Sequence, residues 1–124
     1  MIVGVGVDLL EVERLARDLR KKDGLREEIF TADEIAYCQK KRYPAEHFAA
    51  RFCAKEAFFK ALGSGKRGAM GWREIEVQND QNDRPQIELR GQVKAFAERI
   101  GAKNIHLSLS HTRKLAAAFV ILES

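Results

Sequence analysis

The chain has 124 residues, of which 45% are apolar and 32% are charged, and these proportions are typical of a globular domain that folds in water. Lysine and arginine outnumber aspartate and glutamate by 22 to 18, so the net charge is +4 and an anionic partner is expected. At this length, we expect residues 1–124 to form a single domain.

The first residues, 2–8, alternate between larger apolar residues and glycine or aspartate, which predicts a β-strand. The two glycines, Gly4 and Gly6, leave room beside Asp8 for a bulky neighbour. That neighbour is either a packed helix or a ligand whose charge the carboxylate meets. The apolar run has no basic leader and is interrupted by Asp8, so we expect no signal peptide, no membrane span and a cytoplasmic location.

Residues 11–21 predict a helix with one apolar and one basic side. The basic side carries four cations without interleaved acids: Arg14, Arg17, Arg20 and Lys21. Such a side is most often a solvated surface, and the alternative is a docking surface for an acidic partner.

Thr31 and Glu34 have the spacing of a capping box, which predicts a helix through about residue 40. Pro44 follows a short basic run and is expected to begin the next helix. Cys38 and Cys53 lack CxxC spacing, so we expect both to be reduced thiols in the core.

The helix that follows Pro44 carries charges within its apolar side. Its predicted buried stripe contains Phe48, Phe52, Phe59 and Leu62. Lys55 falls within that stripe, and Glu56 and Lys60 lie along its edge. Because burial of an ion is costly unless it is compensated, a metal, a phosphate or an internal partner is expected. The simpler alternative is that Lys55 extends its ammonium to water and pairs with Glu56.

After this helix, the sequence GSGK at residues 63–66 superficially resembles a phosphate-binding loop. It follows a helix instead of a strand and lacks the upstream glycine of that motif. A helix C-cap with a mobile turn is therefore favoured.

The second half predicts a hairpin of residues 74–79 and 86–90, a helix over 91–101 and a strand over 104–111. Residues 115–122 are a continuous apolar run, which fits a strand buried on both faces. His111 lies in the polar bend before this run, where a surface position is commoner than a ligand or catalytic one.

Several of these side chains are suited to one chemistry. Asp8 and Glu56 are candidate oxygen ligands for a hard divalent cation such as Mg²⁺. The candidate phosphate contacts are Arg51, Lys60, Lys66 and His111. Spacing alone indicates a magnesium-dependent enzyme that acts on a phosphate ester.

Three motifs resemble those of the holo-acyl-carrier-protein synthase family of 4'-phosphopantetheinyl transferases. They are GVGVDLLE at residues 4–11, RFxAKEAFxKALGxG at 51–65 and SLSHT at 108–112. Their order and spacing match over essentially the whole chain, and the combination is specific. One departure lies in the turn after Gln81, where Asp83 stands in a position expected to hold glycine.

The resemblance implies an α+β fold, in which a small, mostly antiparallel sheet packs with helices. It also implies transfer of 4'-phosphopantetheine from coenzyme A to a serine of apo acyl carrier protein, with release of 3',5'-ADP. Asp8 and Glu56 would hold Mg²⁺ against the diphosphate, and Lys60 would stabilise the leaving phosphate. The residues implied around the nucleotide are Arg51, Lys60, Gly63, Gly65 and His111.

The family also assembles as homotrimers with the active site between neighbouring subunits. Asp8 and Glu56 would then meet part of a nucleotide pocket supplied by the next chain. The basic side of residues 11–21 would face the acidic carrier protein, and the reaction would serve fatty acid biosynthesis. A carboxylate or a metal-bound water would accept the serine proton.

Two other classes of function fit parts of the sequence. A nucleic-acid-binding module would account for the positive charge, but the aromatic residues do not alternate with basic ones as stacking platforms require. Steep salt-dependent binding to DNA or RNA would support a nucleic-acid-binding function. A metal-dependent phosphohydrolase would use the same carboxylates but transfer to water. It would release 3',5'-ADP from coenzyme A without a carrier protein.

Overall fold

The structure is a computed structural model that describes residues 1–66 and 68–124. Its helices are α1 (Val12–Lys21), α2 (Leu25–Ile29), α3 (Ala32–Gln39), α4 (Pro44–Ala61) and α5 (Gly91–Arg99), with a short 3₁₀ helix at Trp72–Glu74. Its strands are β1 (Ile2–Glu11), β2 (Ile75–Asn79), β3 (Pro85–Leu89), β4 (Asn104–His111) and β5 (Leu115–Glu123). The predicted elements are confirmed, apart from shifts of a few residues at their ends.

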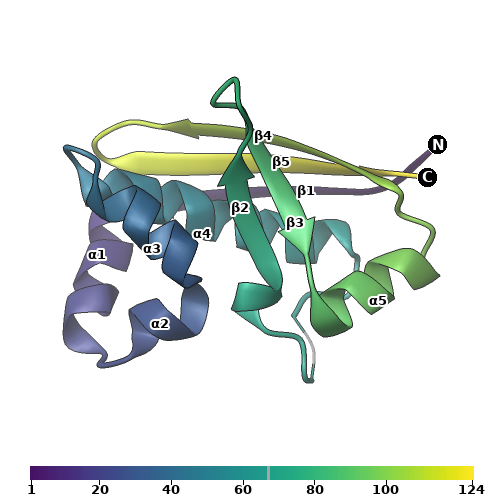
Figure 1. Cartoon of the computed structure of the whole chain (residues 1–124), viewed down its shortest axis with the longest axis horizontal. Helices are drawn as coiled ribbons and strands as arrows, with labels where there is room; N and C mark the ends of the chain where they lie inside the picture. Colours follow the sequence, from purple (N-terminus) through teal and green to yellow (C-terminus); the bar gives the residue numbers. More distant parts are fainter. Residues whose placement is uncertain (67) are drawn as a thin grey trace.

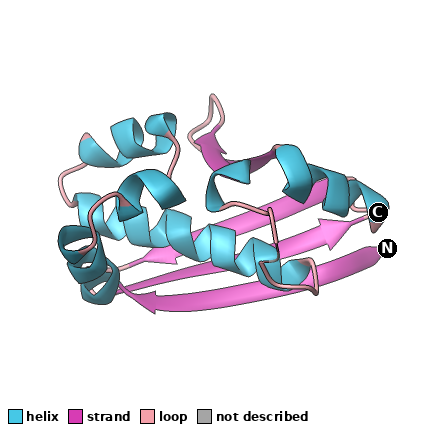
Figure 2. Ribbon diagram, turned by 90° about the horizontal axis from the view of Figure 1, so that it is seen from below, coloured by secondary structure: helices cyan, strands magenta, loops and turns pink. Residues whose placement is uncertain are grey.

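Three strands form an antiparallel sheet in the order β1-β5-β4, and β2 pairs with β3 in a separate antiparallel hairpin. Figure 2 shows the helices gathered on one side of the three long strands. The chain ends lie together, where the amino group of Met1 donates a hydrogen bond of 3.2 Å to the Ser124 hydroxyl (Figure 1). The α+β fold with antiparallel sheets is as the resemblance implied.

Helix α4 packs directly on β1 because the strand carries glycines there. A Cβ atom built on Gly4 would lie 1.9 Å from the carbonyl oxygen of Ala61, and one built on Gly6 would lie 1.9 Å from that of Ala57. Any side chain would therefore push the helix off the strand. Of the two neighbours expected beside Asp8, the packed helix is the one that the glycines accommodate.

The burial of α4 extends beyond the single stripe that its sequence predicts. Phe48, Phe59 and Leu62 are buried as expected and Phe52 is half-buried, but Ala50 and Ala57 on the opposite side of the helix are buried too. The cause is its position, since α4 contacts β1 and β5 on one side and α1, α3 and β2 on others.

Lys55 has an internal partner, and that partner is Glu34. The fully buried ammonium donates to Glu34 Oε1 at 2.8 Å and to the carbonyl oxygens of Trp72 and Ile75. Burial lowers the pKa of Lys55, and the Glu34 carboxylate opposes that effect. The alternative in which Lys55 reaches water and pairs with Glu56 is therefore wrong.

The predicted capping box is present, and it explains why Glu34 is available to Lys55. The Thr31 backbone N–H donates to Glu34 Oε1, and the Glu34 backbone N–H donates to Thr31 Oγ1. The second carboxylate oxygen of Glu34 accepts from the Val77 N–H at 2.8 Å. One carboxylate thus caps α3 and links it to α4 and β2.

The prediction that β5 is buried on both faces is wrong for the isolated chain. Its inner side chains are buried, but Phe119 is 42% exposed on the outer face and Leu9 of β1 is 67% exposed there. The outward-facing apolar side chains are Val3, Val5, Val7, Leu9, Leu115 and Phe119. We call these six residues the outer sheet face.

Three smaller predictions can also be compared with the structure. Cys38 and Cys53 are buried and unpaired, and burial raises the pKa of each thiol to about 12. Asp83 adopts a left-handed φ of 60°, so the β2–β3 turn keeps a conformation in which glycine would be expected. No helix within residues 1–66 and 68–124 has the length and apolar character to cross a membrane.

Candidate functional site

The structure brings Asp8, Glu56 and Lys60 together at one cavity. The cavity has a volume of about 300 Å³ and opens between β1, α1 and α4. Its lining residues are Asp8, Leu10, Arg14, Leu15, Asp18, Phe52, Glu56 and Lys60. Asp8 is distant in sequence from Glu56 and Lys60, and the fold brings the three side chains into one polar group.

Local structure explains how these side chains converge. Glu56 and Lys60 are four residues apart on α4, so they project from the same side of the helix. Asp8 lies on β1, on the strand face that carries Gly6 and therefore faces α4. The close approach of helix and strand at Gly6 holds the three groups within reach of one another.

Charges within the cavity are closely coupled. Lys60 Nζ donates to Asp8 Oδ1 at 3.1 Å and to the Val7 carbonyl oxygen at 3.0 Å. Burial and the negative charge of Asp8 raise the pKa of Glu56, and the Lys60 ammonium opposes this rise. Bringing a cation to the cavity would relieve the repulsion between the two carboxylates.

The donor set is suited to Mg²⁺ bound together with a phosphate group. Asp8 and Glu56 supply carboxylate oxygens, the ligands that Mg²⁺ prefers, from two rigid elements. In the part of the chain that the structure describes, no three His, Cys, Asp or Glu side chains are grouped to bind a metal ion. An ion held by Asp8 and Glu56 would thus take its remaining ligands from substrate phosphates and water.

Sequence reasoning missed two residues of the cavity, Arg14 and Asp18. Both come from α1, where their spacing of four residues places them on one side of the helix. The sequence pattern predicts Arg14 only as part of the basic side of this helix. The signal that could have identified them is this spacing, together with the short connection between β1 and α1.

The basic side of α1 also contains an acid. Arg20 forms an exposed ion pair of 3.0 Å with Glu13, so the description of this side as four cations without interleaved acids is wrong. All four cations are exposed, as a docking surface requires. Arg17 and Lys21 are the two that neither line the cavity nor form an ion pair among the described residues.

Arg51 lies away from the cavity. Its side chain is only 3% exposed, and its guanidinium lies 3.8 Å from the centroid of the Tyr37 ring. It donates a hydrogen bond of 2.8 Å to Asn79 Oδ1 at the end of β2. Its Nε atom is buried and has no hydrogen-bond partner in the described part of the chain.

His111 forms a second separate group at the end of β4. Its Nδ1 lies 3.0 Å from Glu46 Oε1, and its ring packs edge-to-face against His47 with 4.8 Å between centroids. Arg51 and His111 are not among the described residues that line the cavity around Asp8. The structure of one chain therefore divides the predicted site into separate groups.

Gly63 and Gly65 belong to the end of α4, and both adopt left-handed backbone angles, with φ of 80° and 67°. The Gly65 N–H donates to the Phe59 carbonyl oxygen at 3.3 Å, so the helix C-cap prediction is confirmed. The Lys66 ammonium lies 5.7 Å from the centroid of the Trp72 ring. This loop follows Lys60 by only a few residues.

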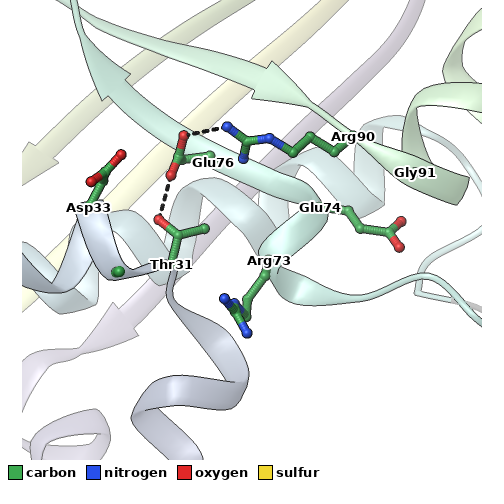
Figure 3. Close-up of a pocket in the computed structure, with 8 residues that line it drawn as sticks. Thr31, Asp33, Arg73, Glu74, Glu76, Arg90 and Gly91 are labelled. Atoms are coloured by element: carbon green, nitrogen blue, oxygen red, sulfur yellow. Dashed lines mark hydrogen bonds and ion pairs between the residues drawn. The ribbon is translucent and has the colours of Figure 1, made fainter.

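Another hollow, of about 490 Å³, lies between the start of α3 and the β2–β3 hairpin (Figure 3). Its polar groups mostly satisfy one another. Glu76 accepts hydrogen bonds from Thr31, Gln78 and Arg90, and Glu74 accepts one from the backbone N–H of Val93 at the start of α5. These contacts join structural elements, so we place the candidate site at the cavity of Asp8 and Glu56.

Comparison with known proteins gives a consistent family. Residues 4–120 match the model of the 4'-phosphopantetheinyl transferase superfamily. The chain is 46% identical over 125 residues to the holo-[acyl-carrier-protein] synthase of Solibacter usitatus, with 100% of each chain covered. It is 44% identical over 124 residues to that of Koribacter versatilis, with 99% of each chain covered.

Solved structures agree with this assignment. The holo-[acyl-carrier-protein] synthase from Neisseria meningitidis is 31% identical and superimposes with a TM-score of 0.90, with 100% of both chains covered. A holo-(acyl-carrier-protein) synthase from Bacillus anthracis in complex with CoA (3',5'-ADP) is 34% identical, with a TM-score of 0.82 and coverage of 100% and 98%. The chain therefore belongs to the holo-[acyl-carrier-protein] synthase family of 4'-phosphopantetheinyl transferases.

Proposed function

We infer that the protein is a transferase that moves the 4'-phosphopantetheine group of coenzyme A to a serine of apo acyl carrier protein. The products are holo acyl carrier protein and 3',5'-ADP. Family membership supports this reaction. The observation on this chain that carries it is the convergence of Asp8, Glu56 and Lys60 on one cavity.

Asp8 and Glu56 are the residues that would hold Mg²⁺, which supplies charge neutralisation and orientation of the diphosphate when bound. In the transfer, the serine oxygen forms a bond to the β-phosphorus and the bond to the 3',5'-ADP oxygen breaks. The leaving phosphate gains negative charge, which the Lys60 ammonium beside Asp8 would stabilise. The serine hydroxyl loses its proton, for which the cavity offers carboxylate acceptors.

The carrier protein docks on the basic side of α1. Its cations are Arg14, Arg17, Arg20 and Lys21. Their charge complements the acidic surface around the modified serine of an acyl carrier protein. Arg14 lines the cavity as well, so this surface leads directly to the carboxylates. A carrier protein bound on α1 would thus bring its acceptor serine to the site of transfer.

On this proposal the protein is a homotrimer whose active sites lie between subunits. The outer sheet face supports an interface, because contiguous exposed apolar side chains commonly mark a contact with another protein. The separation of Arg51 and His111 from the cavity of Asp8 supports it too. The nucleotide contacts Arg51 and His111 of one subunit and the carboxylates of the next.

The reaction takes place in the cytoplasm and supplies fatty acid biosynthesis with active carrier protein. A reducing compartment agrees with the two buried, unpaired cysteines, Cys38 and Cys53.

Incubation of apo acyl carrier protein with the protein, coenzyme A and Mg²⁺ tests the proposal, with the mass of the carrier protein measured afterwards. We expect a gain of one phosphopantetheine group that disappears when Mg²⁺ is chelated. Coenzyme A alone is the control, because release of 3',5'-ADP without carrier protein would indicate a hydrolase. Absence of the mass gain with several carrier proteins would contradict the proposed function.

A further inference from the structure

Glu46 is a buried carboxylate in the first turn of α4 whose main partner is His111 at the end of β4. Glu46 is only 8% exposed, and its Oε1 atom lies 3.0 Å from Nδ1 of His111. Its Oε2 atom is buried without a hydrogen-bond partner among the described residues, and Arg113 Nε lies 3.6 Å from it. Burial of this charge requires compensation, and His111 and Arg113 are the groups that provide it.

The contact with Glu46 determines which nitrogen of His111 carries a proton. An ionised carboxylate only accepts hydrogen bonds, so Nδ1 must be the donor. Nδ1 is then occupied in both the neutral and the charged form of the ring, and Nε2 is the nitrogen left for a ligand.

The orientation of the ring is fixed from a second direction. The His47 ring packs edge-to-face against His111, with an interplanar angle of 65°. Burial lowers the pKa of His47, so His47 favours its neutral form. The groups that face His111 are thus a carboxylate on one side and a neutral aromatic ring on another, with Arg113 beyond the carboxylate.

We propose that Glu46 is a positioning residue for His111, which it holds with Nδ1 protonated so that Nε2 faces the nucleotide. This inference rests on the proposed function, in which His111 contacts the nucleotide. A phosphate oxygen accepts hydrogen bonds, so Nε2 must also carry a proton when it meets phosphate. The Glu46 carboxylate then has two effects: it orients the ring, and it stabilises the imidazolium that the phosphate binds.

Two substitutions separate these effects. Glu46→Gln keeps an oxygen that accepts from Nδ1 but removes the charge, whereas Glu46→Ala removes both. We expect Glu46→Ala to weaken binding of 3',5'-ADP by about 10-fold, the effect of losing one hydrogen bond to a charged group, with a smaller loss for Glu46→Gln. In a double-mutant cycle, Glu46→Ala should add little to His111→Ala, because the two residues act together.

The matched control is another His–Glu pair on the same sheet. His106 Nε2 lies 3.0 Å from Glu123 Oε1, and both side chains are exposed. Glu123→Ala removes an equivalent carboxylate and should leave the affinity for 3',5'-ADP unchanged.

Nitrogen-15 NMR of histidine-labelled protein measures the protonation of His111 directly, including in a Glu46→Ala variant that binds no nucleotide. We expect Nδ1–H in the free wild-type protein, protons on both nitrogens with 3',5'-ADP bound, and loss of the Nδ1–H preference in Glu46→Ala. If Glu46→Ala does not fold, the spectra of the wild-type protein and of Glu46→Gln still show which nitrogen of His111 carries the proton. A wild-type ring with Nε2 protonated and Nδ1 bare, or unchanged affinity in Glu46→Ala, would overturn the inference. Failure of the wild-type protein to bind 3',5'-ADP would instead count against the proposed function, since the tautomer is measured without nucleotide.

Discussion

Lys60 and Asp8 form an ion pair, with 3.1 Å between Nζ and Oδ1, at the cavity that Glu56 also lines. The Lys60 ammonium thus already offsets the charge of one carboxylate in the absence of substrate. On the proposed function, a bound divalent cation would attract Asp8, and the diphosphate would attract Lys60. This exchange of partners makes the roles of the three residues separable by mutation.

Removal of either carboxylate should abolish most of the transfer without unfolding the protein. For Asp8→Ala and Glu56→Ala we expect turnover to fall by at least about 100-fold, the scale for losing a preorganised group that stabilises transition-state charge. Stability should change little, because two neighbouring like charges repel each other. Glu56→Gln should be nearly as damaging. Near-normal turnover of any variant at low Mg²⁺, measured against an exposed Glu98→Ala control, would contradict the ligand assignment.

Lys60→Met should lower turnover while leaving the melting temperature almost unchanged. The Lys60 side chain is 53% exposed, and exposed ion pairs stabilise proteins by about 0–1 kcal/mol. Its proposed role is to stabilise the charge that develops on the leaving phosphate. This charge develops mainly in the transition state, so kcat should fall more than KM rises. Steady-state kinetics with thermal unfolding test this. A loss of stability that matches the loss of rate would indicate a structural role.

Charge reversal on α1 should weaken docking of the carrier protein. Arg14→Glu with Arg17→Glu should raise the KM for carrier protein and flatten the dependence of rate on ionic strength. Coenzyme A binding should be nearly unchanged. Because Arg14 lines the cavity, kcat should fall as well in this variant.

Arg17→Glu with Lys21→Glu is the matched variant, because it changes only cations outside the cavity. We expect its effect to be confined to the KM for carrier protein. If neither double variant changes this KM or its response to salt, the basic side of α1 is a solvated surface and docking occurs elsewhere.

The buried pair of Glu34 and Lys55 should be sensitive to loss of one partner and tolerant of loss of both charges. Lys55→Met leaves the Glu34 carboxylate unpaired in the core, and we expect a cost of about 3–5 kcal/mol in the free energy of unfolding. Adding Glu34→Gln should restore much of it, since glutamine still offers an oxygen to the Val77 N–H. Urea unfolding measures all three variants. Additive losses would show that the two residues do not stabilise each other.

Local features of this fold were predictable because a few residues determine them. The Thr31–Glu34 capping box, the start of α4 at Pro44 and the left-handed cap at Gly63 each depend on residues close together in the chain. Residue type and motif resemblance together predict Asp8 and Glu56 as a pair. The structure adds that one cavity holds both.

The missed features depend on how distant elements meet. Glu34 is 21 residues from Lys55, and no spacing rule indicates that pair. Arg14 reaches the cavity only because α1 is packed beside α4. The apolar run of β5 would look the same whether its outer face met a helix of its own chain or another subunit, so the exposure of Phe119 could not be read from sequence.

Shared active sites predict that two impaired variants restore each other. If the nucleotide contacts His111 of one subunit and the carboxylates of the next, trimers that mix Glu56→Ala and His111→Ala chains contain some sites with neither change. We therefore expect the mixture to regain transfer activity after denaturation and joint refolding. The control mixes Asp8→Ala with Glu56→Ala. Both changes fall on one side of the interface, at the same cavity, so every site keeps a defective carboxylate pair and no activity should return.

The outer sheet face provides the second arm of this test. Val5→Lys with Phe119→Lys places two charges on the apolar surface proposed to join the subunits, and burial of unpaired charges would oppose assembly. We expect a monomer by light scattering, with little transfer activity and an intact fold, because both side chains point away from the core of their own chain. A fully active monomer, or failure of the complementing mixture to regain activity when wild-type chains refold to full activity under the same conditions, would show that one chain contains the whole site.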